Sequence, residues 1–370
     1  MSNHGILKEL DQQWKALLQD NASLRIRDAA ARLCVSEAEL LASQMVVDEP
    51  KCLVTRLDGE YRHLMRDLKP LGKLMALTRN DAMVHEKTGV YENITVHGAM
   101  GLALGTIDLR MFFNHFVYGF AVAEESRVGV RYSLQFFDAT GAAVHKIYAT
   151  NGTNLKAYDQ LVSRYRAGIQ TPVLEISAAD AENLLTSPEA LNLEQLRRDW
   201  GALKDVHHFQ AMLKQHEISR IPAYKVIGTE YAQPLAAEAF ERALTLAAEQ
   251  QLPIMVFVGN RGMIQIHTGP VESLKRTGPW FNVLDSGFNL HANTEQISHL
   301  WLVRKPTVDG LVTSLEMYDN NGQQLALMFG QRDSGKPESE QWRQLLDQLL
   351  QQHALESDAQ VIAESEQEAV

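Results

Sequence analysis

One short segment of the chain combines residue types that can bind a transition metal. Three of the chain's 13 histidines lie in Lys204–His216, and Asp205 precedes two of them, His207 and His208. Because Asp is a favoured helix N-cap, the spacing predicts a helix that begins at Val206. The predicted inward face of this helix consists of Val206, Phe209, Met212, Leu213 and His216. His207 points away from that face, so its imidazole is free to reach a cleft.

The predicted position of His207 favours the neutral imidazole. The amino-terminal end of a helix carries partial positive charge, which disfavours the imidazolium form. Neutral imidazole is the form that ligates iron, so His207 is a candidate iron ligand. An exposed histidine is more often an ordinary surface residue, and the segment taken alone favours that interpretation.

Basic residues occur at the ends of several predicted elements. Arg220 lies at the end of the same helical segment, and Arg304, Lys305 and Arg332 end strand-like stretches farther along. Cations that converge on a cleft could bind the carboxylates of a ligand through charge-assisted hydrogen bonds. Each one taken singly is typical of a solvated surface charge. The hypothesis of an anion-binding pocket therefore depends on their convergence in the fold.

The composition excludes several classes of protein. The chain has 370 residues and a formal net charge of −11, which disfavours non-specific binding to nucleic acid or to anionic membranes. Its two cysteines, Cys34 and Cys52, form no CxxC motif, so a zinc ribbon or a covalent haem attachment site is not expected.

The sequence also predicts the cellular compartment. Met1–Asp20 is polar and lacks the apolar core of a signal peptide. No stretch approaches the ~18 apolar residues of a membrane span. Few cysteines fit a reducing compartment. We therefore expect a cytoplasmic protein that does not cross a membrane.

An internal repeat is the clearest structural signal in the sequence. Asn80–Gly89 aligns with Asn260–Gly269, and Tyr132–Gly141 aligns with Thr313–Gly322. In each copy the second motif contains an Asp-x-x-Gly turn followed by a strand, which is typical of a hairpin. Two motifs in the same order at nearly equal spacing indicate duplication of one module.

The repeat predicts an α+β fold in which each module has an antiparallel sheet and flanking helices. Each copy ends in an amphipathic helix, predicted at Leu155–Tyr165 and at Ser339–Gln352. We predict an amino-terminal repeat at 1–170, a linker at 171–192, a carboxy-terminal repeat at 193–353 and a disordered tail at 354–370.

A helix-turn-helix pattern in Leu24–Leu41 raises the alternative of a DNA-binding protein. Ser36 would cap the second helix, whose exposed face would carry Glu37 and Glu39. Residues that contact bases and phosphates are instead Arg, Lys, Asn or Gln. We therefore expect a helical pair that packs on the sheet, and no nucleic-acid partner.

Several longer motifs occur in a fixed order along the chain. They are Lys204–His207, Ser219-Arg220, Val256–Gly262, Trp301–Gly310 and Phe329–Arg332. In this order they resemble the HemS/HmuS/ChuS/PhuS family of cytoplasmic haem-trafficking and haem-degrading proteins from Gram-negative haem-uptake systems. The resemblance extends over roughly Ile26 to His353. It implies two similar α+β halves, with haem b held in a cleft between them.

The resemblance also implies roles for individual residues. His207 matches the proximal ligand of the haem iron, and its neighbour His208 could serve as an alternative ligand. Arg110 matches a distal-side arginine from the first half, which would be the catalytic residue of an enzyme. His85 matches a histidine of a possible second haem site.

Further basic residues match those that hold the haem propionates or line the pocket, namely Arg220, Lys305 and Arg332. Leu327 and Phe329 depart from the pattern, because several members carry Gln and Tyr there. The loss of those polar groups puts the finer hydrogen bonding around haem in doubt.

Two functions therefore remain open from the sequence. A carrier would receive haem from an inner-membrane ABC importer and deliver it for iron release, for example to a haem oxygenase. An enzyme would open the porphyrin itself in an oxygenase-like or reductant-dependent reaction. The chain lacks a GxGxxG nucleotide-binding motif, so its electrons would come from a partner or a diffusible donor.

Overall fold

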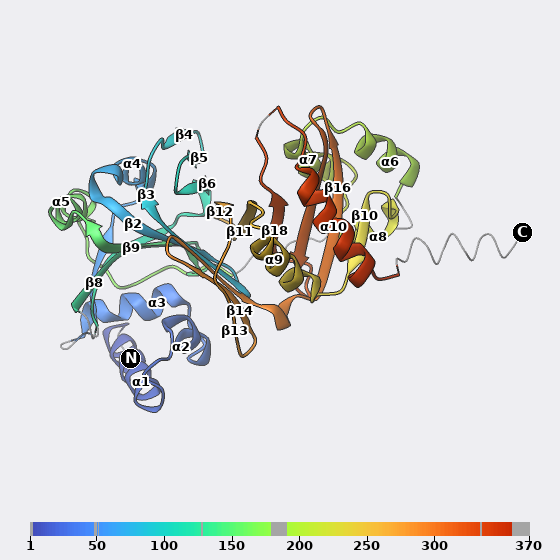
Figure 1. Cartoon of the computed structure of the whole chain (residues 1–370). Helices are drawn as coiled ribbons and strands as arrows, with labels where there is room; N and C mark the ends of the chain where they lie inside the picture. The colour runs from blue at the N-terminus through green and yellow to red at the C-terminus, as the bar shows by residue number, and fades with distance from the viewer. Residues whose placement is uncertain are drawn as a thin grey trace, which may run out of the picture. The chain divides into compact units, whose positions relative to one another are not determined.

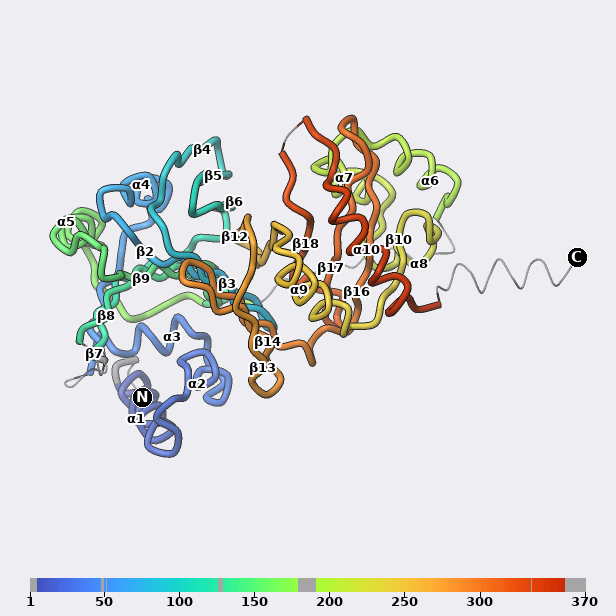
Figure 2. The backbone as a smooth tube through the Cα atoms, in the orientation of Figure 1, coloured from blue at the N-terminus to red at the C-terminus, as the bar shows by residue number. Residues whose placement is uncertain are grey.

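The computed structural model describes residues 3–47, 50, 52–126, 129–178, 191–333 and 335–356 (Figures 1 and 2). The chain forms two compact units. Unit 1 comprises Met1–Arg79, His85–Asp180 and Gly259–Gln265, and unit 2 comprises Asn80–Val84, Ala181–Val258 and Ile266–Val370. The helices and strands of the two units, given below, confirm the predicted α+β fold with a duplicated module.

Unit 1 has an antiparallel sheet in the order β1-β7-β8-β9-β2-β3. The bounds of these strands are β1 Cys52–Leu57, β7 Tyr118–Ser126, β8 Gly129–Phe137, β9 Ala143–Thr153, β2 Gly72–Arg79 and β3 Met83–Val90. A smaller meander consists of β4 Thr95–His97, β5 Met100–Ala103 and β6 Asp108–Phe112. The helices of unit 1 are α1 Asn3–Asp20, α2 Ile26–Arg32, α3 Glu37–Ala42, α4 Tyr61–Arg66 and α5 Leu155–Tyr165, with 3-10 turns η1 Ser43–Val46, η2 Lys69–Leu71 and η3 Phe113–His115.

Unit 2 repeats this plan with a sheet in the order β10-β16-β17-β18-β11-β12. The bounds of these strands are β10 Ala232–Leu235, β16 His299–Thr307, β17 Gly310–Tyr318, β18 Gln324–Gly330, β11 Ile254–Gly259 and β12 Met263–Gly269. Its meander consists of β13 Leu274–Thr277, β14 Trp280–Asp285 and β15 Phe288–Asn293. The helices are α6 Leu193–Gly201, α7 Phe209–Gln215, α8 Arg220–Ile227, α9 Ala239–Glu249 and α10 Glu340–His353, with 3-10 turns η5 Val206–His208 and η6 Thr294–Gln296.

Alternation along each strand buries both faces of the main sheets. In β7, Phe120 and Val122 pack on one face with residues of α3, while Ala121 packs on the other with residues of α4 and α5. In β16, Trp301 packs with residues of α6–α8, while Leu302 packs with residues of α9 and α10. Figure 1 shows α9 and α10 side by side in unit 2. The period-two pattern of a strand explains why one apolar run supplies two layers.

The turns confirm the duplication at atomic level. Asp138 Oδ1 accepts hydrogen bonds from the backbone N–H groups of Thr140 (2.9 Å) and Ala142 (3.1 Å). Asp319 Oδ1 accepts the equivalent bonds from Asn321 (2.9 Å) and Gln323 (2.8 Å). The turns close at Gly141 and Gly322, with φ of 75° and 77°, a conformation that glycine adopts without steric cost.

A reciprocal exchange of short segments was not predicted from the sequence. Residues 80–84 belong to unit 2, where the Asn80 side chain donates to the carbonyl of Leu325 (2.7 Å). Residues 259–265 belong to unit 1, where the Asn260 side chain donates to the carbonyl of Val144 (2.9 Å). Contiguous domain boundaries at 170 and 193 therefore omit these two segments, because each is held by backbone groups of the other module.

The predicted helix boundaries are close to the observed ones. The closing helices occur as α5 and α10, within a residue of their predicted bounds. Residues 179–190 of the predicted linker and 357–370 of the predicted tail lie outside the described residues. In the part of the chain that the structure describes, no helix is both long and apolar enough to span a membrane.

The predicted exposure of Glu37 in the helix-turn-helix segment is wrong. Ser36 does cap α3 in a capping box with Glu39. Glu37, however, is buried and forms ion pairs with Arg79 and Lys146. Burial would raise the pKa of Glu37, but these two cations hold the pKa below its usual value. Two paired cations allow a carboxylate to face the sheet, so the segment is a packing element of unit 1.

The packing of α10 on the sheet of unit 2 gives a stability prediction. A Cβ added to Gly330 in β18 would lie 2.5 Å from Cγ of Trp342, which is fully buried and donates its Nε1–H to the Thr313 carbonyl (3.0 Å). Gly330→Ala is therefore expected to lower the free energy of unfolding by about 1–3 kcal/mol. A matched Gly287→Ala variant, whose Cβ would meet nothing within 4 Å, serves as the control. Equal urea midpoints for the two variants would contradict this packing.

Candidate functional site

Asp205 and His207 form a bonded pair at the start of η5. Asp205 Oδ1 accepts hydrogen bonds from the backbone N–H (2.8 Å) and from ring Nδ1 (2.6 Å) of His207. The predicted N-cap at Asp205 is confirmed, although the first turn is a 3-10 turn that leads into α7. The His207 side chain is 84% exposed, so the prediction that it points away from the packed face is also confirmed.

The hydrogen bond to the Asp205 carboxylate determines which ring nitrogen of His207 carries the hydrogen. In a neutral imidazole one nitrogen donates and the other accepts, and a carboxylate can only accept. In the neutral ring, Nδ1 therefore carries the hydrogen and Nε2 presents its lone pair. The two hydrogen bonds from His207, backbone first and then ring, lower the pKa of the Asp205 carboxyl. This arrangement, a carboxylate behind an exposed imidazole, is common at metal-ligating histidines.

Phe209 fixes the backbone that carries His207 and His208. Its side chain is 1% exposed, and its ring contacts Trp200 edge-on with centroids 4.6 Å apart. Arg220 Cζ and Lys305 Nζ lie over the same ring, 5.2 and 4.5 Å from its centroid. His208, directly before Phe209, is exposed like His207. The two exposed histidines thus sit on an anchored turn.

A buried carboxylate, Glu316, brings Arg220 and Lys305 together. Its side chain is fully buried and pairs with Lys305 Nζ through Oε1 and with Arg220 Nη1 (3.0 Å) through Oε2. Three hydroxyl groups complete its shell, those of Ser314 (2.8 Å), Tyr224 (2.7 Å) and Tyr318 (2.6 Å). Two of the three basic residues that the resemblance assigns to the propionates or the pocket lining therefore converge on one acceptor.

The electrostatics of this cluster leave an excess of positive charge. Burial would raise the pKa of Glu316, but Lys305 and Arg220 hold it well below its usual range. Burial lowers the pKa of Lys305, and Glu316 opposes that shift. One carboxylate thus faces two cations. Lys305 is only 5% exposed, while Arg220 is 23% exposed and can still meet an anion from solvent.

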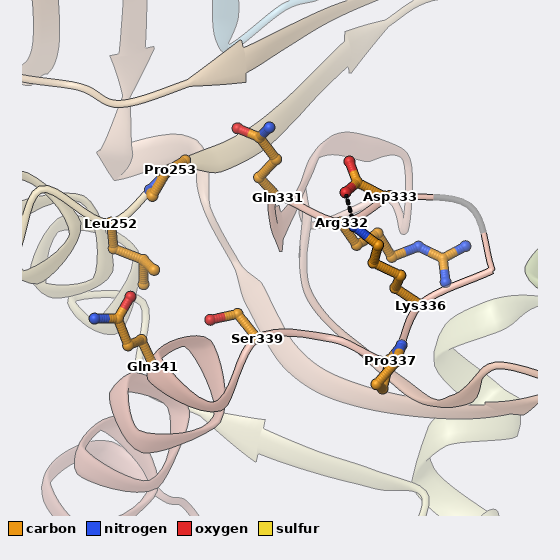
Figure 3. A pocket seen from close by; sticks show the side chains of 9 residues that line it. All are labelled: Leu252, Pro253, Gln331, Arg332, Asp333, Lys336, Pro337, Ser339 and Gln341. Atoms are coloured by element: carbon orange, nitrogen blue, oxygen red, sulfur yellow. Dashed lines mark hydrogen bonds and ion pairs between the residues drawn. The ribbon is translucent and has the colours of Figure 1, made fainter.

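Arg332 lies elsewhere in unit 2, beside a cavity of about 290 Å³ (Figure 3). The cavity is lined by Leu252, Pro253, Gln331, Arg332, Asp333, Lys336, Pro337, Ser339 and Gln341. In Figure 3 the guanidinium of Arg332 points away from Leu252 and Pro253. Within the described residues it makes no bond to Glu316, and its buried Nη1 has no hydrogen-bond partner. The structure therefore does not join Arg332 to the Glu316 cluster.

The two predicted residues of unit 1 have different environments. Arg110 on β6 is 31% exposed, pairs with Asp108 and donates to the Leu109 carbonyl (3.2 Å). His85 on β3 is fully buried, with Nδ1 2.8 Å from Gln265 Nε2. A haem could reach His85 only if this part of the sheet opened. Its role in a second haem site stays a prediction.

The buried side chain of His85 is part of a polar network inside unit 1. Thr78 Oγ1 contacts His145 Nδ1 (2.9 Å) and donates to Gln265 Oε1 (2.8 Å), and Tyr91 contacts His145 Nε2 (2.8 Å). Burial lowers the pKa of His145 to about 3, so this imidazole stays neutral. His85 and Gln265 are the equivalent positions of the two aligned Asn80 and Asn260 motifs. The network therefore joins the exchanged segment 259–265 to unit 1.

Sequence reasoning missed Glu316, Tyr224 and Tyr318. One signal was available, because a carboxylate inside the apolar strand Thr313–Tyr318 requires a cationic partner. The pairing of Asp205 with the His207 ring also went unforeseen, since the cap prediction considered only the backbone.

Comparison with known proteins identifies the family. The haemin-degrading HemS.ChuX domain matches residues 34–165 and again residues 217–349. The chain belongs to this family. The double match covers most of both modules, in agreement with the duplicated fold.

Characterised relatives agree over nearly the whole chain. The hemin transport protein HemS of Yersinia enterocolitica is 38% identical over 344 residues, which cover 92% of this chain and 97% of HemS. The solved structure of holo-PhuS, a heme-binding protein from Pseudomonas aeruginosa, matches with a TM-score of 0.89 and 43% identity, over 93% of this chain and 99% of that one. ChuS, described as an E. coli heme oxygenase, matches with a TM-score of 0.82 and 33% identity, over 92% of this chain and 99% of that one.

Removing the Glu316 charge should destabilise unit 2. Glu316→Gln leaves the buried Lys305 and the partly exposed Arg220 without their counter-ion, so we expect the free energy of unfolding to fall by about 3–5 kcal/mol. Asp333→Asn is the matched control, because it neutralises a carboxylate that pairs with Lys336 at the surface. Chemical denaturation of both variants at pH 7 measures the difference, and equal stability would contradict the role of Glu316.

The difference in stability between wild type and Glu316→Gln should depend on pH. A carboxyl whose pKa is depressed by folding stabilises the folded state above its unfolded pKa, near 4.5 for Glu316. That contribution is lost as the pH falls below 4.5. The stability gap between wild type and Glu316→Gln should therefore shrink by about 1.4 kcal/mol per pH unit below 4.5. A gap that does not change between pH 7 and pH 3.5 would contradict this account.

Proposed function

We propose that this chain is a cytoplasmic haem-binding protein that accepts imported haem b through Nε2 of His207 and delivers it for iron release. The observation that carries this proposal is the exposed His207 imidazole, whose Nδ1 is bound by Asp205 so that Nε2 is the ligating atom. Haem is the cargo in this account. An ABC importer of the inner membrane would supply it, and a haem oxygenase would receive it.

The surrounding side chains fit the chemistry of haem. Haem presents an iron that takes an axial imidazole and two propionates that need cations. Arg220, partly exposed and adjacent to Phe209 of the ligand turn, supplies such a cation. The excess positive charge around Glu316 would be balanced by a propionate. Lys305, more deeply buried, acts mainly by holding Glu316.

The names of the relatives support the same assignment. HemS is a hemin transport protein, and PhuS is a heme-binding protein. HmuS of Yersinia pestis, 37% identical over 347 residues, is also a hemin transport protein. Further contacts from Arg110 and Arg332, and a haem cleft between the halves, stay predictions. Leu327 and Phe329 offer no polar group, so the proposed site relies on His207 and Arg220.

The second candidate is a haem-degrading enzyme. ChuS is described both as a heme oxygenase and as a heme degrading enzyme, and this observation favours it. Bound haem would supply an iron that binds O₂ and a porphyrin ring that is oxidised. Arg110 could donate hydrogen bonds on the distal side, and His207 would hold the iron. A protein partner or a diffusible reductant would supply the electrons.

Loss of the ligand should weaken haem binding strongly. His207→Ala removes the proposed axial nitrogen, so we expect haem affinity to fall by more than the roughly 10–100-fold that losing an outer partner of a metal ligand costs. His63→Ala, which removes an exposed histidine of unit 1, is the control. Titration followed by the Soret band measures both variants.

Two results of that titration would contradict the proposal. Absence of a Soret band at stoichiometric haem in wild type would overturn haem binding itself. A wild-type spectrum and affinity for His207→Ala would exclude His207 as the ligand and direct attention to His208 or His85.

Carrier and enzyme are separated by adding a reductant. A carrier should keep its Soret band with ascorbate in the presence of catalase, and should transfer haem to an added acceptor. An enzyme should lose the Soret band with formation of an open tetrapyrrole, and Arg110→Ala should abolish that loss. Lys156→Ala, which removes an exposed basic residue of the same unit, is the matched control for Arg110→Ala. Loss of the Soret band only when catalase is absent would result from free peroxide, and that outcome would contradict the enzyme.

A further inference from the structure

One oxygen atom of Asp205 binds both the backbone and the ring of His207. Oδ1 accepts the backbone N–H at 2.8 Å and Nδ1–H at 2.6 Å. We propose that Asp205 is a positioning residue that selects the Nδ1–H tautomer of His207 and increases electron donation from Nε2 to the haem iron. The second half of this proposal rests on the proposed haem-binding function.

The position of the Asp205 carboxylate does not depend on the ring of His207. The extended backbone of Asp205 (φ −151°, ψ 139°) and its role as N-cap of η5 place Oδ1 against the turn. The backbone N–H of His208 donates to the Asp205 carbonyl (3.1 Å), which closes the same turn. Phe209, the residue that follows this turn, is buried against Trp200 and fixes the end of the turn. The acceptor for Nδ1 is therefore in place before any ligand binds.

The same geometry distinguishes the two neighbouring histidines. His207 has a carboxylate on Nδ1, whereas the ring of His208 makes no hydrogen bond or ion pair within the described residues. A ring held in one tautomer and one orientation loses less freedom when Nε2 binds a metal. Asp205 thus makes His207 the primary ligand and leaves His208 as the secondary one.

A carboxylate behind the ligand also changes the bound metal. Hydrogen bonding from Nδ1–H to an anionic acceptor raises the basicity of the ligating nitrogen. A more basic nitrogen stabilises ferric over ferrous iron and so lowers the reduction potential of bound haem. This property would hold imported haem in the ferric state until electrons arrive from a donor.

Substitution by Asn separates the two roles of Asp205. Asn caps a helix as well as Asp does, so Asp205→Asn keeps the turn but removes the negative charge. Asp205→Ala removes both the cap and the charge. Asp199→Asn is the matched control, because Asp199 Oδ2 contacts Nε2 of His216 (2.8 Å) in the same unit, at a histidine with no proposed ligand role.

The first readout needs no haem. Nitrogen-15 NMR of the imidazoles at alkaline pH should show His207 as the Nδ1–H tautomer in wild type and as a mixture of tautomers in Asp205→Ala. Asp199→Asn should leave the His207 signals unchanged. A wild-type ring that is mostly Nε2–H, or one that is unaffected by Asp205→Ala, would overturn the positioning role.

The second readout uses the haem complex. Asp205→Asn should lower the iron–histidine stretching frequency in resonance Raman spectra of the ferrous protein and raise the reduction potential. If ferric affinity falls tenfold more than ferrous affinity, the potential rises by about 59 mV. An unchanged stretching frequency and an unchanged reduction potential would show that Asp205 acts only as a helix cap. Absence of haem binding in wild type would instead overturn the proposed function and the electronic role together, while the NMR result decides the tautomer by itself.

Discussion

The candidate site depends on the ion pairs of the buried Glu316 carboxylate. It accepts from five side chains, among them the two cations Arg220 and Lys305. Those cations lie over the ring of Phe209, and Phe209 anchors the turn that presents His207. A charge buried in a sheet is tolerated only with such partners. The fold therefore links the ion cluster of the interior to the exposed imidazole through a single aromatic ring.

The two copies of the module differ at the positions that build the Glu316 cluster. The strand that carries Ser314 and Glu316 in unit 2 carries Ser133 and Gln135 at the aligned positions in unit 1. Gln135 donates to Ser133 Oγ (3.0 Å) and has no charge to attract cations. These aligned positions thus form a neutral pair in unit 1 and part of a charged cluster in unit 2, while the buried ion pairs of unit 1 are built on Glu37 instead. Side-chain chemistry, rather than the module itself, defines the candidate site.

The sequence predicted elements better than contacts. The repeat, the α+β class, the closing helices and the Asp205 cap follow from short-range patterns, which turn chemistry and apolar periodicity determine. The exchange of 80–84 and 259–265 could not be predicted, because it depends on side-chain bonds to backbone groups far away in sequence. The burial of Glu37 and Glu316 was missed for the same reason. A single carboxylate in a sequence does not reveal which cations will meet it.

The central claim is that Nε2 of His207 ligates the haem iron while Nδ1 keeps its hydrogen bond to Asp205. The most direct test is a crystal structure of the protein with haem bound. We predict iron bonded to His207 Nε2, the Asp205 contact retained, and a propionate against the exposed edge of Arg220. Iron bonded to His208 or His85, or haem bound away from the turn Val206–His208, would contradict the account.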